Sequence, residues 1–536
     1  MAGLGAGPET GGMSPLNIAD FVVILLYFGG VTACGLYFAR RNKSTEEYFL
    51  GNRSFPGWAI GLSMVGTSIS SLSFLGIPAD SYKTAWLRFL VGVTMPLVVL
   101  AGAYLFLPFY RRTKTTSAFE YLEHRFGPIT RLYGAVTFLF GQLVRIAMVL
   151  YLLALVLHGL TGWHLWVCVL VSGVFVSFYT VAGGIEAVVW TDVVQTIILA
   201  AGGVICLVKI VALLPGGLGQ IMDVAGEAGK FQFAELMPDG VLRKTTWGFS
   251  LSDKTALMVV FVGLTHFMAE YACNQNVVQR YCASSSAREA RKAMLICCVA
   301  SMVLWTFFRF LGTSLYVFFQ HFPSVDTDAM LTGAKKAEEV LPYFIMRFLP
   351  AGLSGLVLAA VLAAAMSSLD SSLNAISTVS VVDIYKRHIA KERDDTHYLM
   401  VARTVAIAAS VFMIGGAMVL SYSDMKTLGD TGTKVSAILA GGLLGLYLLG
   451  FLTTRGDGRA VAMAIGCTVL WSAYMALADA KLLPEFLVPN IDSYYTGIIG
   501  NIVMFVVGYA GALMLPQKPR DMTNLSIWTQ DKTPLQ

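Results

Sequence analysis

Long runs of apolar residues recur along the whole chain and are separated by short polar stretches. A helical run of about twenty apolar residues matches the thickness of the hydrocarbon core of a bilayer. The pattern therefore predicts thirteen membrane-spanning helices, at about residues 20–39, 56–80, 85–109, 132–159, 164–183, 187–213, 254–274, 293–319, 350–380, 398–421, 427–453, 459–478 and 493–515.

Composition agrees with this pattern. Of 536 residues, 56% are hydrophobic and 13% are charged, which leaves too little polar surface for a soluble fold. We expect an all-α polytopic membrane protein with an N-terminal tail (1–17), a transmembrane domain (18–515, core about 56–453) and a C-terminal tail (516–536). No stretch is long enough for a fused soluble domain, and no phosphate-binding loop or metalloprotease motif occurs, so we do not expect an enzyme.

Lysine and arginine in the short loops predict the orientation, because cytoplasmic loops are enriched in them. With the N-terminus outside, the inner loops receive most of these residues: Arg40, Arg41, Lys43, Arg53, Arg111, Arg112, Lys114, Arg125, Arg131, Arg280, Arg288, Arg291, Lys292, Lys386, Arg387, Lys391, Arg393, Arg455 and Arg459. We expect a multi-pass protein of the cell (inner) membrane with its C-terminus in the cytoplasm. The net charge of +5 then reflects topology and gives no reason to expect nucleic-acid binding.

The run between Leu358 and Thr378 carries unusually many polar residues for a membrane span. On a helix, Ser367, Asp370, Ser371 and Asn374 fall on one stripe. Their oxygens are hard ligands that suit an alkali cation. Small serines could instead serve close helix packing. The carboxylate favours the cation site, because a charge at this depth needs a partner.

The second predicted span is polar in its middle, where it reads Gly66-Thr67-Ser68-Ile69-Ser70-Ser71, followed by Ser73. These residues are poor helix formers. Non-helical backbone at membrane depth is tolerated only where it lines a site enclosed by protein. The segment is either an unwound part of the span that offers carbonyl and hydroxyl oxygens, or a serine-rich packing face.

Three charged residues inside predicted spans also need partners. Asp192 follows the helix-ending pair Gly183-Gly184 and either pairs locally or faces Asp370 and Ser371 across a cation site. Arg145 and Arg309 lie in otherwise apolar spans, and an arginine there stays charged. Each must find an anion from a ligand or from the protein, where Glu270 is a candidate.

Four sequence blocks together resemble the sodium:solute symporter family. They are STEEYFLGNRSFPGWAIG (44–61), YTVAGGIEAVVWTDVVQ (179–195), CNQNVVQR (273–280) and AAAMSSLDSSLNAIST (363–378), within a match of about residues 18–455. The resemblance implies the inverted-repeat core of the bacterial leucine-transporter fold, with spans two to six and seven to eleven as its repeats. It also implies a broken first core helix and alternating access around a site at the membrane midplane.

The resemblance implies two sodium sites. The principal site would use backbone oxygens near Gly66 and Ile69, the Ala364 carbonyl, and the hydroxyls of Ser367 and Ser368. A second site, found in some sialic-acid symporters of the family, falls on Asp192, Asp370 and Ser371. Asp370 replaces the usual hydroxyl, so this site would bind sodium more tightly, exchange it for a proton, or be structural.

The sialic-acid subgroup also places an arginine of the fourth span against the substrate carboxylate, at Arg145. Its substrate-facing hydroxyls correspond to Ser68, Ser70 and Ser73. A glutamine of the subgroup is Gly92 here, and an aromatic residue falls on Arg88 or Phe89, so the pocket has changed.

We therefore expect a sodium-coupled symporter, functional as a monomer in the lipid bilayer, that imports a small organic solute. The solute is expected to carry a carboxylate, as sialic acid does. The alternative is a neutral sugar or other uncharged solute. A channel would need a continuous pore lined by rings of ligands, and a sensor would need an attached signalling domain; neither is visible in the sequence.

Overall fold

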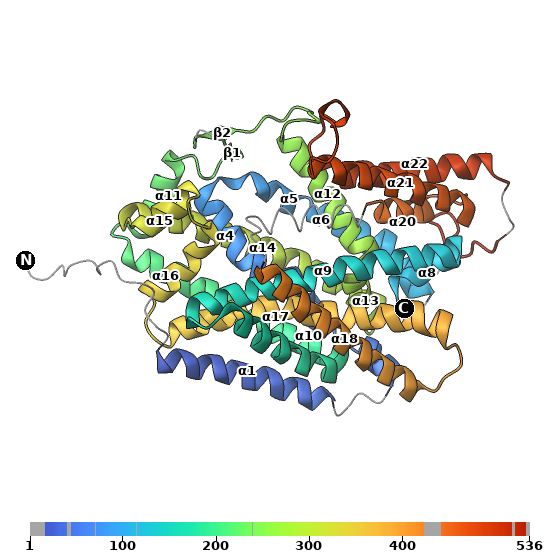
Figure 1. Ribbon diagram of the computed structural model, residues 1–536, viewed down its shortest axis with the longest axis horizontal. Helices are drawn as coiled ribbons and strands as arrows, with labels where there is room; N and C mark the ends of the chain where they lie inside the picture. Colours follow the sequence, from blue (N-terminus) through green and yellow to red (C-terminus); the bar gives the residue numbers. More distant parts are fainter. Residues whose placement is uncertain are drawn as a thin grey trace, which may run out of the picture.

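The computed structural model describes residues 17–39, 44–69, 71–113, 115–237, 240–422, 441–516 and 520–531. These residues are almost entirely helical, and the longer helices run roughly along the longest axis of the molecule (Figure 1). The expected all-α polytopic fold is confirmed at this level. Ten helices of the described part are long and apolar enough to cross a membrane, or eleven if one bent pair counts as a single span.

The longer helices, with one short apolar helix, are α1 (Ile18–Ala39), α3 (Gly57–Ser68), α4 (Ser71–Lys83), α9 (Pro128–Thr161), α10 (Leu165–Leu213), α12 (Ala256–Cys273), α14 (Ala287–His321), α17 (Leu353–Val379), α18 (Asp395–Tyr422), α20 (Leu443–Leu452), α21 (Gly458–Asp479) and α22 (Tyr495–Met514). Two predicted spans, 164–183 and 187–213, form α10, which is kinked at Gly184 with φ 59°. The predicted span 427–453 begins outside the described residues, and α20 lies in its second half.

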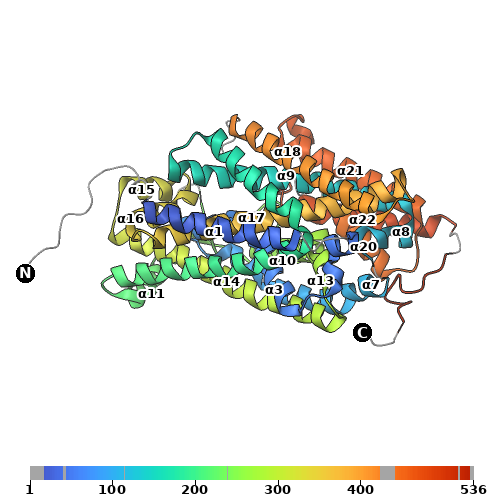
Figure 2. The same ribbon diagram turned by 90° about the horizontal axis from the view of Figure 1, so that it is seen from below.

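Shorter elements connect these helices: α2 (Thr45–Leu50), η1 (Gly51–Arg53), η2 (Trp86–Arg88), α5 (Phe89–Val93), α6 (Met95–Ala101), η3 (Gly102–Phe106), α7 (Leu107–Arg112), α8 (Ala118–Phe126), α11 (Gly217–Glu227), α13 (Gln275–Ala283), α15 (Val325–Thr332), η4 (Ala337–Glu339), α16 (Val340–Phe348), η5 (Ser380–Ile389) and η6 (Glu485–Leu487). The strands β1 (Ala234–Leu236) and β2 (Leu242–Lys244) form an antiparallel hairpin. Helices α11, α15 and α16 gather at one end of the long axis, and α7 and α8 at the other (Figures 1 and 2). We call these the α15 end and the α8 end.

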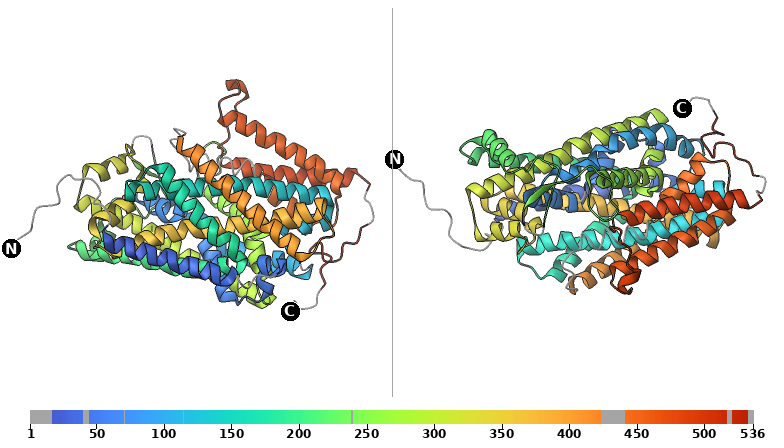
Figure 3. Two further views of the ribbon diagram at one scale, coloured as in Figure 1. Left: turned by 60° about the horizontal axis from the view of Figure 1, so that its bottom comes forward. Right: turned by 90° about the horizontal axis from the view of Figure 1, so that it is seen from above.

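Helix α17 lies in the middle of the bundle, between α1 on one side and α21 and α22 on the other (Figures 1 and 3). All but two of its side chains are buried, serines and aspartate included. Its start is fixed by α1, because the Asp20 carboxylate accepts hydrogen bonds of 2.7 Å from the Gly352 N–H, the Gly355 N–H and the Ser354 hydroxyl. These donors belong to the first turn, where helix N–H groups lack partners of their own.

The second predicted span is a broken helix, as the sequence predicted. Helices α3 and α4 meet at an angle of 56°. Both halves pack against the single long helix α14 at glycines that allow backbone contact. A Cβ atom on Gly57 would lie 2.4 Å from the Glu289 carbonyl oxygen, and one on Gly312 would lie 2.1 Å from that of Pro78. Helix α14 therefore spans the break and supports the helix on either side of it.

A second broken helix joins α12 to α13 at Asn274, which has extended backbone (φ −78°, ψ 117°) and accepts a hydrogen bond from the Asn276 N–H through its side chain. We expected residues 275–283 in an inner loop. That expectation is wrong, because these residues form helix α13 and every one of them is buried. Arg280, counted among the loop cations, is consequently inside the protein.

Loss of the Asp20 carboxylate should weaken the start of α17. Replacing a residue that caps a helix N-terminus costs about 0.5–2 kcal/mol, and hydrogen bonds to a charged group contribute about 1.5–3 kcal/mol. We expect Asp20→Ala to lower the free energy of unfolding by about 2 kcal/mol, measured as a lower Tm of the purified protein. Asp20→Asn keeps an acceptor oxygen and should recover part of the loss. A wild-type Tm for Asp20→Ala would show that α17 does not need this cap.

Candidate functional site

The centre of the molecule is built around the break between α3 and α4. Helix α3 ends at Ser68, and Ile69 has extended backbone (φ −104°, ψ 94°). A helix that ends here leaves carbonyl oxygens of its last turn without the usual intrahelical donors. These oxygens lie at the depth of the polar stripe of α17, because Gly66 touches that helix. A Cβ atom on Gly66 would lie 2.9 Å from the Ser367 Oγ and 2.8 Å from the Thr196 Oγ1.

Helix α17 contributes two neighbouring hydroxyls and a buried backbone at this point. Ser367 donates a hydrogen bond of 2.5 Å to Oδ1 of Asp192. The Ser368 Oγ is buried and has no hydrogen-bond partner among the described residues. Ala364 and Ile69 are also buried. A buried hydroxyl without a partner is costly, so Ser368 has a free oxygen for a ligand such as a cation.

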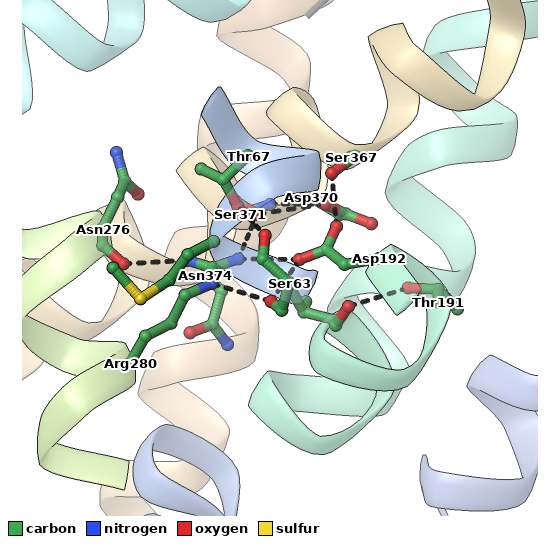
Figure 4. Close-up of polar contacts among 12 residues, drawn as sticks. Ser63, Thr67, Thr191, Asp192, Asn276, Arg280, Ser367, Asp370, Ser371 and Asn374 are labelled. Carbon is green, nitrogen blue, oxygen red and sulfur yellow. Dashed lines mark hydrogen bonds and ion pairs between the residues drawn. The ribbon is translucent and has the colours of Figure 1, made fainter. Parts of the chain in front are cut away.

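Beside these hydroxyls, Arg280 of α13 and Asp192 of α10 form a fully buried ion pair (Figure 4). The Arg280 Nη2 lies 2.8 Å from Oδ2 of Asp192 and 2.5 Å from the Ser371 Oγ. Its Nε donates to the Ser63 Oγ at 2.8 Å, and its Nη1 donates to the Asn276 carbonyl oxygen at 2.8 Å. The guanidinium therefore joins α3, α10 and α17 to α13.

The second carboxylate, Asp370, is fully buried and is held by neutral donors. Its Oδ2 accepts a hydrogen bond of 3.1 Å from the Tyr179 hydroxyl, and its Oδ1 accepts one of 2.6 Å from the Ser371 N–H. Within the described part of the chain, no lysine or arginine forms an ion pair with Asp370. The three residues assigned to a second sodium site thus lie together, with Arg280 bound to two of them.

A cavity of about 1890 Å³ begins next to the break between α3 and α4 and extends to α15 and α16 at the α15 end. Ser68 and Ser73 line it, as do Arg88, Phe89 and Gly92, where the sequence departs from the sialic-acid subgroup. The Ser68 hydroxyl donates to the Met64 carbonyl oxygen at 2.8 Å. The third predicted substrate hydroxyl, that of Ser70, lies outside the described residues. The cavity is large enough for a sugar-sized solute.

Arg145 is half-buried on α9, two helical turns from Leu152, which lines the cavity. Two turns correspond to about 10 Å along the helix axis. Arg145 has no hydrogen bond or ion pair with the described residues. Its suggested partner Glu270 instead accepts a hydrogen bond of 2.7 Å from the Asn274 amide. The alternative in which Arg145 pairs with Glu270 is therefore not found among the described residues.

Arg309 does have an internal anion, but it is not Glu270. The Arg309 Nη1 lies 3.2 Å from Oδ2 of Asp80, on the wall of the cavity. Sequence analysis left two origins open for this anion, the protein or a ligand, and in the structure it comes from the protein. Asp80 was not predicted as the partner of Arg309. It lies at the end of a predicted span, where an acidic residue can face water and needs no buried cation.

Sequence reasoning also missed Arg280 as a site residue. Arg280 follows a predicted span by six residues, so counting loop charges assigned it to the inner surface. The signal that could have found it was Asp192, because a carboxylate inside an apolar helix requires a cation. The block CNQNVVQR contains that cation.

Comparison with known proteins adds independent information. Residues 48–466 match the sequence profile of the sodium:solute symporter family. The chain is 30% identical over 501 residues to the sodium/sialic acid symporter of Proteus mirabilis (strain HI4320), covering 93% of this chain and 96% of the relative. It is 29% identical over 496 residues to the sodium/sialic acid symporter of Aliivibrio fischeri (strain ATCC 700601 / ES114), covering 92% and 93%. A solved structure of a Na+-coupled sialic acid symporter, outward-open and substrate-bound, superimposes with a TM-score of 0.82 at 28% identity, covering 93% of this chain and 98% of the other.

Breaking the buried ion pair should destabilise the protein strongly. Removing one partner of such a pair typically costs about 3–5 kcal/mol, because a buried charge is left uncompensated. We expect this loss for Arg280→Met, measured as a lower Tm. The exposed pair of Arg459 with Asp457 is the control, where Arg459→Met should cost no more than about 1 kcal/mol.

The double variant tests the coupling itself. Arg280→Met combined with Asp192→Asn removes both charges of the pair and should be more stable than Arg280→Met alone. If the loss of stability in the double variant equals the sum of the losses in Arg280→Met and Asp192→Asn, Arg280 and Asp192 are not energetically coupled.

Proposed function

The chain belongs to the sodium:solute symporter family, and on that premise we propose that it imports a carboxylate-bearing solute, with sialic acid as the best candidate, by coupling uptake to the sodium gradient. The observation that carries the proposal is the helix break at Ile69 beside the unsatisfied hydroxyl of Ser368. The likeness to two sodium/sialic acid symporters over more than nine-tenths of the chain supports the choice of ion and solute.

The principal sodium ion binds between α3 and α17 in this proposal. Its ligands are backbone oxygens near Gly66 and Ile69, the Ala364 carbonyl, and the hydroxyls of Ser367 and Ser368. Support comes from the contact between Gly66 and Ser367 and from the free Ser368 hydroxyl. Oxygens from a helix break and from a facing helix are the ligands on which such transporters depend.

A second cation binds at Asp192, Asp370 and Ser371. The charges of the cluster support this assignment, because two ionised carboxylates and the single Arg280 guanidinium leave one uncompensated negative charge. A monovalent cation, either sodium or a proton, would neutralise it. Because Arg280 already satisfies Asp192, the added cation belongs nearer to Asp370, which has only neutral donors.

The solute binds in the cavity, at the end that lies next to the break between α3 and α4. Hydroxyls of Ser68, Ser70 and Ser73 contact its polar atoms, and the Arg145 guanidinium binds its carboxylate. Arg145 supports this assignment because it lacks an internal anion among the described residues. A charged guanidinium inside a membrane protein is retained where a ligand or a partner needs it.

The finer architecture follows the family pattern. Thirteen spans form the domain 18–515, with two inverted repeats in the core at about 56–453, and the protein works as a monomer. The two broken helices, α3–α4 and α12–α13, support the repeats, because they correspond to the first span of each half. The α15 end faces outward and the α8 end lies in the cytoplasm, so that the N-terminal tail is outside and the C-terminal tail inside.

Uptake should depend on sodium through the Ser368 hydroxyl. We expect Ser368→Ala to raise the sodium concentration for half-maximal uptake at least several-fold while leaving Tm unchanged, because this hydroxyl has no protein partner to lose. Ser377→Ala is the matched control on the same helix, since the Ser377 hydroxyl donates to the Ala402 carbonyl oxygen and should not affect sodium dependence. Full uptake in sodium-free medium by the wild type would refute the assignment of the coupling ion.

Arg145 should bind the negatively charged carboxylate of the solute. Losing one partner of a buried charge pair costs about 2–5 kcal/mol, so Arg145→Ala should weaken the binding of sialic acid by about thirtyfold or more. Arg145→Lys should recover only part, since an ammonium cannot make the two parallel hydrogen bonds of a guanidinium. Isothermal titration with sialic acid and its methyl ester measures both effects. Equal affinity of the wild type for acid and ester would favour the alternative, a neutral solute.

A further inference from the structure

One wall of the cavity is aromatic. Trp305 of α14 and Phe267 of α12 both line the cavity, with ring centroids 5.7 Å apart and ring planes inclined by 31°. Gly92 of α5 lines the cavity beside them. A Cβ atom on Gly92 would lie 3.4 Å from Cε3 of Trp305, so a side chain at this position would lie against the indole ring. Because Gly92 has none, and Trp305 is only partly buried, part of the indole remains open to the cavity.

Close packing between α5 and α12 holds this wall in place. A Cβ atom on Gly263 of α12 would lie 2.8 Å from the Val91 carbonyl oxygen, so the two backbones pack directly against each other. Gly263 lies about one turn before Phe267, and Val91 is next to Gly92. The opening in front of Trp305 is therefore fixed by backbone contact.

Trp305 lies at the depth of the break between α3 and α4. Helix α14 packs along α4, with the rings of Phe308 and Phe74 5.0 Å apart and with Gly312 against the backbone of Pro78. The residue numbers of these two pairs differ by the same amount, so the two helices advance together in the same direction. Trp305, about one turn before Phe308, is therefore level with the start of α4.

The hydroxyls proposed to bind the solute lie at the same depth. Ser68 is the last residue of α3 and Ser73 lies in the first turn of α4, and both line the cavity. The indole N–H of Trp305 has no hydrogen-bond partner among the described residues, whereas that of Trp86 donates to the Thr313 Oγ1 at 3.0 Å. Trp305 therefore offers a solute both an apolar ring and a free donor.

This combination matches the chemistry of a sugar ring. The face of an aromatic ring carries partial negative charge and attracts weakly positive hydrogens, such as those on the carbons of a sugar. A sugar ring also has oxygens at its edge that can accept a hydrogen bond from an indole N–H. A short carboxylate without a ring has too little apolar surface to cover the indole.

We propose that Trp305 is a specificity-determining residue that packs against the ring of the transported solute. This inference rests on the proposed function, because it takes Arg145 to bind the carboxylate of that solute. With carboxylate and ring bound by different residues, a solute that has both is preferred to a short carboxylate that has no ring. Gly92 contributes by keeping the space in front of the indole free.

Substitutions at Trp305 and Gly92 test this contact by isothermal titration with sialic acid. We expect Trp305→Ala to weaken binding by about tenfold or more, and Trp305→Phe to keep most of the affinity, because an aromatic ring remains. Gly92→Leu leaves Trp305 in place but covers its ring, so it should weaken binding by a similar factor. Trp166→Ala, at an exposed position that does not line the cavity, is the matched control and should bind as the wild type does.

Tryptophan fluorescence separates a contact with the solute from a purely structural role of Trp305. We expect sialic acid to change the emission of the wild type, and Trp305→Phe to lose most of this change while it still binds. Trp86→Phe is the matched control and should keep the change, because Trp86 does not line the cavity.

A purely structural Trp305 predicts the opposite pattern. Gly92→Leu would then bind sialic acid with wild-type affinity, and Trp305→Phe would show an unaltered emission change. Either result, or no emission change in a wild type that binds sialic acid, would overturn the contact and leave the proposed function intact. If the wild type bound no sialic acid in the titration, the proposed function itself would fail.

Discussion

The buried ion pair of Arg280 with Asp192 is the interaction on which the centre of this structure depends. Its guanidinium binds oxygens from α3, α10 and α17 at one point. Without a positive charge there, two carboxylates and several hydroxyls would be packed together far from water, an arrangement that is costly in a membrane interior. With it, the cluster retains one uncompensated negative charge, which the proposed second cation would neutralise. In that proposal, the fold and ion binding depend on the same charge.

The two helix breaks impose a second constraint, because backbone groups released from a helix must find other partners at membrane depth. At Asn274 the side chain itself accepts a hydrogen bond from the next helix. Just before Ile69 the chain packs closely against α10 and α17, since a Cβ atom on Gly66 would lie 2.8 Å from the Thr196 Oγ1 and 2.9 Å from the Ser367 Oγ. Of these two breaks, the one at Ile69 adjoins the proposed principal sodium site.

Much of this arrangement could be predicted from the sequence, because its signals were local. Apolar run length predicted the helices, the glycine and serine content predicted the break near Ile69, and helical periodicity predicted the stripe from Ser367 to Asn374. The partners of the charges could not be predicted, since pairing depends on tertiary contacts. Arg280 looked like a loop residue because α13 is short and polar, and Asp80 gave no sign that it would meet Arg309 from a helix more than two hundred residues away.

The support of both α3 and α4 by α14 has a mechanical consequence. A broken helix suggests that its two halves could move independently of each other. Here each half contacts the same continuous helix, α14, through closely packed backbone, at Gly57 on one side of the break and at Gly312 on the other. Interfaces so tight do not slide without separating. We therefore expect α3, α4 and α14 to move together, so that a motion that opens the cavity first to one side of the membrane and then to the other would take place between these three helices and the rest of the bundle.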